Sequence, residues 1–299
     1  MGVMTFAAAQ LLRVLPRNAI SRAMGALCEA ELPAPMMRRI VSVYSRAYDV
    51  NMEEACPSGV PYTSFDAFFT RKLREGSRPL AGDDRTMVSP ADGRIVDVGR
   101  ADAHGTITVK GKPYTLEELI GDEAWARELS GGGFAVVYLS PRDYHRVHAP
   151  CAGKIVRVRG IEGDRYPVNR IGEEHVPGLF VKNRRVVMDL RSPEFGRVAV
   201  VMVGAMIVGR MTVVGIDTPD VQGEHVPSPA LECSRGDEIG KFHLGSTVVL
   251  VIPPDHLDRF TRDPGDVSFG QALAVARAAS PEKERQAKER PPKTNGSRA

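Results

Sequence analysis

Three short segments of the chain carry side chains whose types could do covalent chemistry. Asp92 is followed by a glycine and a Val/Ile-rich run, and His145 and His148 lie three residues apart after a second such run. Ser246 directly precedes a third run. A serine, a histidine and an acid are the parts of a nucleophile that a base activates and an acid orients. The segments are Ser89–Gly93, Asp143–Pro150 and Phe242–Thr247.

Each segment alone also has an ordinary structural interpretation. Asp92-Gly93 is a common turn sequence, and Gly245-Ser246 before a strand is equally usual. His145 and His148 could share a metal, cap a loop, or serve as acid and base. A metal site would be incomplete, because no third and fourth ligands stand at a typical spacing. The other histidines are expected to be ordinary surface or loop residues: His104, His175, His225, His243 and His256.

The three segments lie in a part of the sequence that is typical of short strands separated by Gly and Pro. Helices are expected before and among these strands, so we expect an α+β fold with a β-rich core. Thr115 and Glu118 predict a short capped helix between the first two strands. The expected strands are Arg94–Val98, Phe134–Leu139, Lys154–Val158, Val198–Val203, Met211–Val214 and Thr247–Ile252.

The first fifty residues are expected to form N-terminal amphipathic helices. Met36–Tyr48 has apolar residues at helical spacing, with arginines available to the rest of its surface. Such a helix either packs on the protein's own core, which periodicity favours, or lies in a membrane interface with its arginines on anionic headgroups. Thr63 is expected to cap a further helix that contains Phe68-Phe69, two residues that we assign to the core.

Three regions are expected along the chain. Residues 1–62 form a helical, membrane-associating region, residues 63–279 form a β-rich catalytic domain, and the charged residues 280–299 form a disordered tail. The 299 residues carry a net charge of +3, which argues neither for nor against nucleic acid. Four scattered cysteines without a CxxC pair fit a reducing compartment.

Taken together and in this order, the three segments resemble the phosphatidylserine decarboxylase family, in the form found in its bacterial membrane-associated branch. The resemblance runs from about Leu15 to Ala274, and the tail after Ser280 departs from the family pattern. The matching pieces are Phe68–Arg71, Pro90–Gly93, Tyr144–Pro150, Val203–Ala205 and Gly240–Thr247.

The resemblance implies a chain that cuts itself between Gly245 and Ser246. His148 would take the proton of the Ser246 hydroxyl while Asp92 orients the ring, and the hydroxyl would attack the carbonyl of Gly245. Glycine leaves that carbonyl approachable and tolerates the unusual backbone angles that the attack needs. Ser246 would then become a pyruvoyl group at the start of the small fragment.

The resemblance also implies the cofactor and the partners. The pyruvoyl group would be the cofactor, with no metal and no pyridoxal phosphate. Its ketone would form a Schiff base with phosphatidylserine and accept the electrons released as CO2 leaves, which gives phosphatidylethanolamine. His145 would supply the proton that replaces the carboxylate. We expect the two cleavage fragments to stay associated on a membrane surface. The sequence leaves open whether the chain forms a homodimer, and we expect no binding to nucleic acid.

The N-terminal sequence indicates how the chain would meet the membrane. Met1–Leu12 is apolar but too short to cross a bilayer, which needs about 20 residues. The first basic residue is Arg13, so the charged start of a signal peptide is missing. With the basic N-terminal region and the scattered cysteines, this predicts peripheral attachment to the cytoplasmic side of the cell membrane.

Two other function classes compete with a decarboxylase. A serine hydrolase acting on external substrates would use the same residue types, although the chain contains no GxSxG sequence. A non-enzymatic module that binds anionic lipid would use the basic amphipathic helices, and an intact chain that binds vesicles but releases no CO2 would favour it. A zinc peptidase is the weaker candidate, because the metal-ligand histidines and acids are not paired as required.

Overall fold

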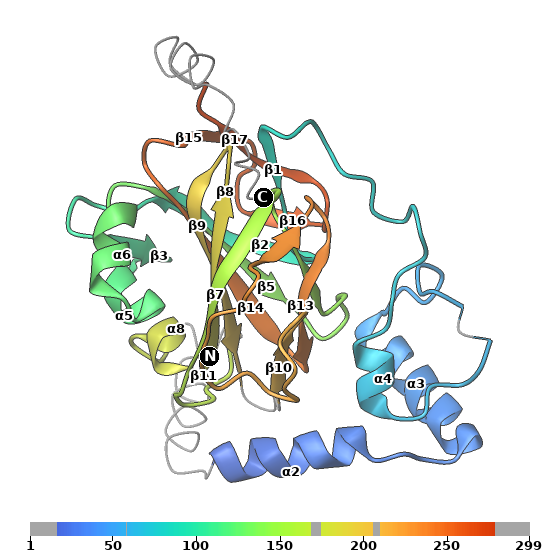
Figure 1. The fold of residues 1–299 in the computed structure, drawn as a ribbon. Coiled ribbons are helices and arrows are strands. Elements are labelled where there is room, and N and C mark those ends of the chain that lie inside the picture. The colour runs from blue at the N-terminus through green and yellow to red at the C-terminus, as the bar shows by residue number, and fades with distance from the viewer. Residues whose placement is uncertain (1–16, 58, 169–174, 206–209, 279–299) are drawn as a thin grey trace, which may run out of the picture.

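The computed structural model describes residues 17–57, 59–168, 175–205 and 210–278. It has an α+β fold with a β-rich core, as the sequence predicts (Figure 1). The expected tail, residues 280–299, lies outside the described residues, as does the beginning of the expected helical region.

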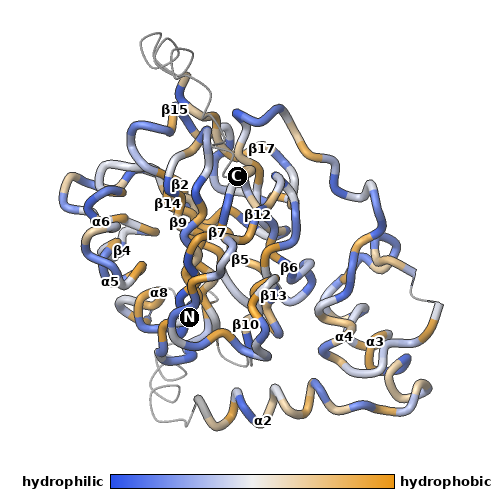
Figure 2. Tube along the Cα trace, in the orientation of Figure 1, coloured by the Kyte–Doolittle hydropathy of each residue, from blue (hydrophilic) through white to orange (hydrophobic). Residues whose placement is uncertain are grey.

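A nine-stranded antiparallel sheet forms the centre of the molecule. Its order is β11–β7–β8–β9–β14–β5–β2–β16, and β12 also pairs with β7. All seven residues of β14 are buried between β5 and β9, and Figure 2 shows apolar residues along these central strands. The strands are β2 (Gly93–Arg100), β5 (Gly133–Leu139), β7 (Gly153–Ile161), β8 (Arg185–Ser192), β9 (Gly196–Gly204), β11 (Gly223–His225), β12 (Leu231–Cys233), β14 (Ser246–Ile252) and β16 (Gly265–Val267).

A small sheet of order β10–β13–β6 lies beside the central one. It contains β6 (Arg146–His148), β10 (Arg210–Val213) and β13 (Glu238–His243). Only Leu244 and Gly245 separate β13 from β14, so the chain crosses from the small sheet to the central sheet within two residues. The remaining pairings are β1 (Thr86–Val88) and β15 (Leu257–Phe260) with β17 (Ala272–Ala276), and β3 (Thr106–Val109) with β4 (Lys112–Thr115).

All six expected strands are confirmed, but the sequence did not predict β8. Its interior contains Asp189, which is 2% exposed and interrupts the apolar run. Arg197 of the neighbouring strand β9 donates to this carboxylate at 2.9 Å. A charge can therefore lie in a buried strand here because its partner comes from the next strand.

The helices form two groups on opposite sides of the sheets (Figure 1). One group is α2 (Arg17–Glu29), α3 (Ala34–Tyr48) and α4 (Phe65–Phe69), and an extended segment leads from α4 to β1. The other is α5 (Leu116–Ile120), α6 (Glu123–Leu129) and α8 (Leu179–Lys182).

The caps of two short helices test the sequence predictions. The predicted cap at Thr115 is confirmed, because its hydroxyl accepts the N–H of Glu118 at 3.2 Å. The predicted cap at Thr63 is wrong by one residue: Ser64 accepts the N–H of Ala67 at 3.1 Å, and α4 begins one residue after it.

Leu250→Ala should lower the free energy of unfolding by about 2–5 kcal/mol, because Leu250 is fully buried in β14 and its loss leaves a cavity. Urea denaturation measures the free energy of unfolding, and every variant also carries Ser246→Ala so that the chain stays uncut. Val226→Ala, at a side chain that is 67% exposed, is the control and should change stability by less than about 0.5 kcal/mol. Equal effects of the two changes would contradict the placement of β14.

Candidate active site

A tight turn after β1 places Asp92 at one end of the central sheet. Ser89 donates its hydroxyl to the carbonyl oxygen of Ala91 at 2.8 Å within the turn. Gly93 has φ 153°, and a Cβ there would lie 2.1 Å from the carbonyl oxygen of Tyr138. Glycine is therefore required for β2 to approach β5 at this point. Asp92, the residue before it, is 7% exposed.

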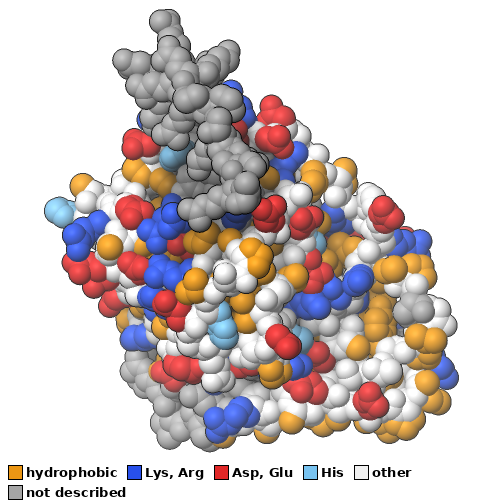
Figure 3. Space-filling model, in the orientation of Figure 1, with side chains coloured by type: hydrophobic (Ala, Val, Ile, Leu, Met, Phe, Trp, Pro, Cys, Tyr) orange, Lys and Arg blue, Asp and Glu red, His pale blue; other side chains and the backbone are white. Residues whose placement is uncertain are grey.

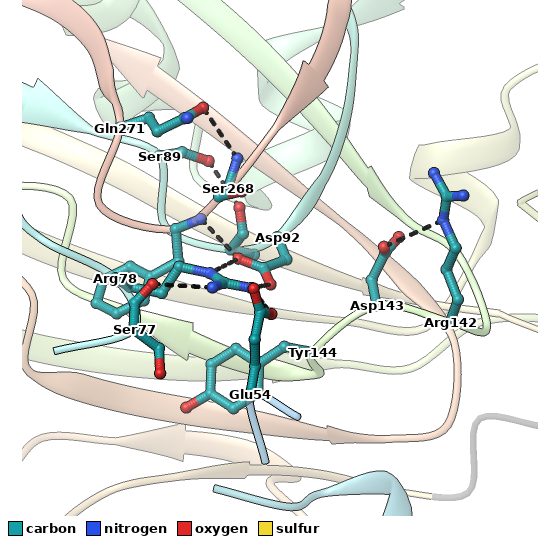
Figure 4. A network of polar contacts seen from close by, with 12 residues as sticks. Glu54, Ser77, Arg78, Ser89, Asp92, Arg142, Asp143, Tyr144, Ser268 and Gln271 are labelled. Carbon is teal, nitrogen blue, oxygen red and sulfur yellow. Dashed lines mark hydrogen bonds and ion pairs between the residues drawn. The ribbon is translucent and has the colours of Figure 1, made fainter. Parts of the chain in front are cut away.

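Arg78 holds both carboxylate oxygens of Asp92 (Figure 4). Its Nε and Nη2 donate to Asp92 at 3.0 and 2.7 Å, and Nη2 also donates to Glu54 at 2.7 Å. The backbone N–H of Phe269 donates to Asp92 Oδ1 at 2.7 Å. The hydrogen bond to Asp92, more than the bond to Glu54, raises the pKa of Arg78 above its usual range. The guanidinium of Arg78 therefore stays charged at neutral pH.

His148, the last residue of β6, is enclosed by two aromatic rings. Its ring stacks on that of Phe269 with centroids 3.7 Å apart and also stacks on Tyr144. Nδ1 lies 2.8 Å from the carbonyl oxygen of Gly236 and so carries a proton, which leaves Nε2 to accept from the Tyr144 hydroxyl at 3.0 Å. Burial lowers the pKa of His148, so the neutral ring that can act as a base predominates at neutral pH.

His145 is completely buried, with its ring centroid 4.0 Å from that of Phe69 in α4. Nδ1 donates to the carbonyl oxygen of Asp143 at 2.8 Å, and Nε2 has no hydrogen-bond partner among the described residues. Burial lowers the pKa of His145 to about 3. At neutral pH the ring of His145 is therefore neutral in the intact chain, because the fold removes it from water.

Ser246 is the first residue of β14 and pairs with Leu139 of β5 and Gly204 of β9. It is fully buried, and its hydroxyl has no hydrogen-bond partner within the described part of the chain. Leaving a buried hydroxyl unpaired costs about 1–3 kcal/mol, so such a group in a native core requires an explanation such as a catalytic role.

The backbone just before Ser246 is strained at Leu244. Leu244 has φ 90°, a conformation that residues with side chains rarely adopt. Gly245 has no positive φ, and a Cβ added there would meet no atom within 4 Å. In the intact chain the unusual backbone angle therefore lies at Leu244, where the turn between the two sheets begins. That Gly245 tolerates the angles of the attack stays a prediction.

The four predicted residues gather at one end of the central sheet. β14 begins at Ser246 on one side of β5, and β2 begins directly after Asp92 on the other side. Neighbouring strands are about 4.8 Å apart, so these two residues lie about two strand widths from each other. His145 and His148 come from the segment after β5, and the His145 carbonyl accepts the N–H of Phe242, four residues before Ser246, at 3.0 Å.

The hydrogen bonds expected of an Asp92–His148–Ser246 triad are not formed among the described residues of this intact chain. Arg78 occupies the Asp92 oxygens, and the Tyr144 hydroxyl occupies Nε2 of His148. The roles of base and orienting acid therefore stay predictions. Sequence reasoning missed both of these partners. Tyr144 stands inside the histidine segment, where its spacing from His148 is a usable signal, whereas nothing local marks Arg78.

A cavity of about 450 Å³ opens beside Asp92 and Tyr144. Arg71 lines it although this residue is only 5% exposed; it donates to the carbonyl oxygen of Arg142 at 3.2 Å and lies over the ring of Phe68. A larger cavity of about 860 Å³, around β12, contains none of the four predicted residues. Within the described residues, no three His, Cys, Asp or Glu side chains gather as a metal site.

Comparisons with known proteins agree on one family. The family model described as phosphatidylserine decarboxylase matches residues 65–275, which include all four predicted residues. The chain is 39% identical over 252 residues to the phosphatidylserine decarboxylase proenzyme of Anaeromyxobacter sp. (strain K), with 81% of this chain and 88% of that protein covered.

Two further relatives carry the same name. The proenzyme of Methylobacillus flagellatus is 43% identical over 248 residues, with 79% of this chain and 87% of that protein covered. The proenzyme of Myxococcus xanthus is 36% identical over 272 residues, with 89% and 97% covered. Because the family model matches most of the chain and these relatives are covered almost end to end, the chain belongs to the phosphatidylserine decarboxylase family.

Proposed function

We propose that this chain is a phosphatidylserine decarboxylase that cuts itself between Gly245 and Ser246 and uses the resulting pyruvoyl group to convert phosphatidylserine into phosphatidylethanolamine and CO2. The observation that carries the proposal is the family match over residues 65–275, a region whose four candidate residues lie at one end of the central sheet. The relatives are named proenzymes, which supports a precursor that is processed.

Cleavage begins with the Ser246 hydroxyl, which attacks the carbonyl carbon of Gly245 and converts the amide into an ester. His148 takes the hydroxyl proton, which first requires the Tyr144 hydroxyl to leave Nε2. Asp92 stabilises the charged ring that forms. Elimination across Ser246 then breaks the ester and leaves a carboxylate on Gly245. One water enters and one ammonia leaves, and position 246 becomes the pyruvoyl group.

The surroundings of Ser246 fit a cofactor that is made from the chain itself. Its hydroxyl is buried without a partner in the described residues, and the strained Leu244 lies two residues before it. The pyruvoyl ketone supplies an electron sink for the bond that breaks as CO2 leaves. His145 is the side chain to which we assign the returning proton: its Nε2, which has no partner among the described residues, takes the proton from solvent and passes it to the carbon that has lost CO2.

The position of β14 supports two fragments that stay associated after cleavage. β14 belongs to the small fragment, yet it is buried along its whole length between β5 and β9 of the large fragment. β16 and β17 of the small fragment also pair with β2 and β1 of the large one. Separation would expose a complete core strand to water, which the hydrophobic effect opposes.

The helical region, residues 1–62, is the part that we propose to contact the membrane, with residues 63–279 as the catalytic domain. Figure 3 shows apolar side chains gathered at the lower right of the view, over this helical group. In α3 only Met37 is fully buried, so the helix packs on the protein through one face and leaves apolar residues on another. Five of the eight large apolar side chains exposed in the described residues lie here: Leu27, Met36, Val43, Tyr48 and Val60.

The same region combines apolar surface with positive charge. A cavity of about 710 Å³ opens between α3 and the segment before Tyr62, with Arg38 and Arg46 in its wall. Arginines beside apolar surface suit anionic headgroups with their acyl chains. None of the described helices is long and apolar enough to cross a membrane. We propose peripheral attachment at the cytoplasmic face of the cell membrane, which four cysteines without a disulfide support.

Ser246→Ala should remain a full-length, inactive chain, because it lacks the attacking hydroxyl. Ser192→Ala is the matched control: it removes another buried hydroxyl, from β8, and should cleave normally. Gel electrophoresis measures cleavage, and CO2 release from phosphatidylserine with a labelled carboxylate measures activity. A cleaved Ser246→Ala chain would contradict the proposed site.

His145→Ala should cleave but decarboxylate at least about a hundredfold more slowly, because the reaction loses its proton donor. His148→Ala should accumulate as the uncut precursor, since the Ser246 hydroxyl loses its base. Asp92→Asn should be cleaved slowly, because it lacks the negative charge that stabilises the charged ring of His148. The same two assays apply, with circular dichroism to verify folding. A folded His145→Ala chain that stays uncut would overturn this division of roles.

The double variant Met36→Glu/Val43→Glu should bind vesicles that contain phosphatidylserine at least about tenfold more weakly, because two charges enter the apolar contact surface. Val214→Glu/Val226→Glu is the matched control, since these valines are exposed to a similar extent, 51% and 67% against 53% and 61%, but lie on the β-rich part. Co-sedimentation measures both. Undiminished binding of the helix variant would place the membrane contact elsewhere.

A further inference from the structure

A polar cluster links α4 to the strand that leads into Ser246. Nδ1 of His243, the last residue of β13, lies 2.8 and 3.0 Å from the two carboxylate oxygens of Asp66. Its Nε2 lies 3.3 Å from the hydroxyl of Thr212 on β10, and Arg210 approaches Asp66 at 3.7 Å. The expectation that His243 is an ordinary surface or loop residue is wrong, because its side chain is 13% exposed and both ring nitrogens have partners.

An apolar cluster encloses the next residue, Leu244. Leu244 is 8% exposed and belongs to one buried apolar cluster with Cys28 of α2 and Phe69 of α4. Its backbone nevertheless has φ 90°, which a leucine disfavours because of its Cβ. A strained conformation of this kind persists only where the surrounding structure holds it.

Both flanks of Leu244 are fixed. On one side, the backbone of His243 pairs with Arg210 in β10 while its side chain binds Asp66. On the other side, Ser246 pairs with β5 and β9. The strain is therefore confined to the two-residue link, directly beside the bond that is proposed to break.

We propose that Asp66 and His243 form a positioning clamp for self-cleavage, which holds Leu244 in its strained conformation until the bond between Gly245 and Ser246 breaks. This inference rests on the proposed cleavage. The attack of the Ser246 hydroxyl requires one orientation of the Gly245 carbonyl, and the φ of Leu244 sets the direction of the link that carries it.

The clamp makes cleavage depend on the helical region. Asp66 lies in α4, which packs against α2 and α3, and Cys28 of α2 belongs to the same buried cluster as Leu244. The helices that we propose to meet the membrane, α2 and α3, thus support the segment to be cut through α4. Asp66 and His243 touch neither the nucleophile nor the carbonyl, so they act through the backbone of Leu244.

The test follows cleavage of the freshly synthesised full-length chain on gels over time. Asp66→Ala should slow cleavage by about tenfold or more, which corresponds to about 1.4 kcal/mol or more of activation free energy. Asp66→Ala/Leu244→Gly should recover most of the lost rate, because glycine adopts φ 90° without strain and needs no clamp. A residue that merely stabilises the fold would not be rescued by introducing a glycine.

Asp122→Ala is the matched control. The side chain of Asp122 is 19% exposed against 16% for Asp66. It caps the distant helix α6 and pairs with Arg157 of β7, so the Asp122→Ala chain should be cleaved at the unaltered rate. Asp66→Leu keeps roughly the size of the side chain but accepts no hydrogen bond from His243, and it replaces Asp66→Ala if that variant does not fold; the same slowing and the same recovery are expected of it.

Three results are decisive. An unaltered cleavage rate in the Asp66 variant overturns the clamp. So does a slowed rate that Leu244→Gly does not recover. If the unaltered chain itself never cleaves, the proposed function fails instead, so the two failures are distinguishable.

Discussion

The two-residue link between β13 and β14 is the constraint on which the rest of the structure depends. β13 is fixed by its partners β10 and β6 in the small sheet, and β14 is fixed by β5 and β9 in the central sheet. Hydrogen-bonded ladders on both sides leave little freedom, so the change of direction falls on Leu244 and Gly245 and appears as φ 90° at Leu244. A longer loop would spread that change over more dihedral angles. The short link instead concentrates it beside a single peptide bond.

The boundary between the small sheet and the central sheet also explains why the candidate residues lie near one another. β6 delivers His148 from the small sheet, while Ser246 and Asp92 stand where β14 and β2 begin in the central one. The rings of Phe69 and Phe269 pack on His145 and His148, and burial lowers the pKa of both histidines. Ser246 and His145 are fully buried. This burial suits the proposed attack on a carbonyl that the chain itself supplies.

The sequence predicted what depends on local pattern. The Val/Ile runs gave β5 and β14, and Thr115 was correctly identified as a helix cap. It did not predict β8, because Asp189 is neutralised by a residue of the neighbouring strand. It missed Arg78 and the Asp66–His243 pair for the same reason, since these partners are far apart in the chain. It did not predict the strained backbone of Leu244, because the crossing between the two sheets decides where the chain must turn.

The central claim is that position 246 becomes a pyruvoyl group through cleavage of the bond before it. The most direct measurement is the intact mass of the purified, freshly folded protein without added substrate. The account predicts a large fragment ending at Gly245 and a small fragment whose mass is one ammonia lower than that of a peptide beginning with Ser246. A single unmodified chain, or a small fragment that retains an ordinary serine at its start, would contradict it.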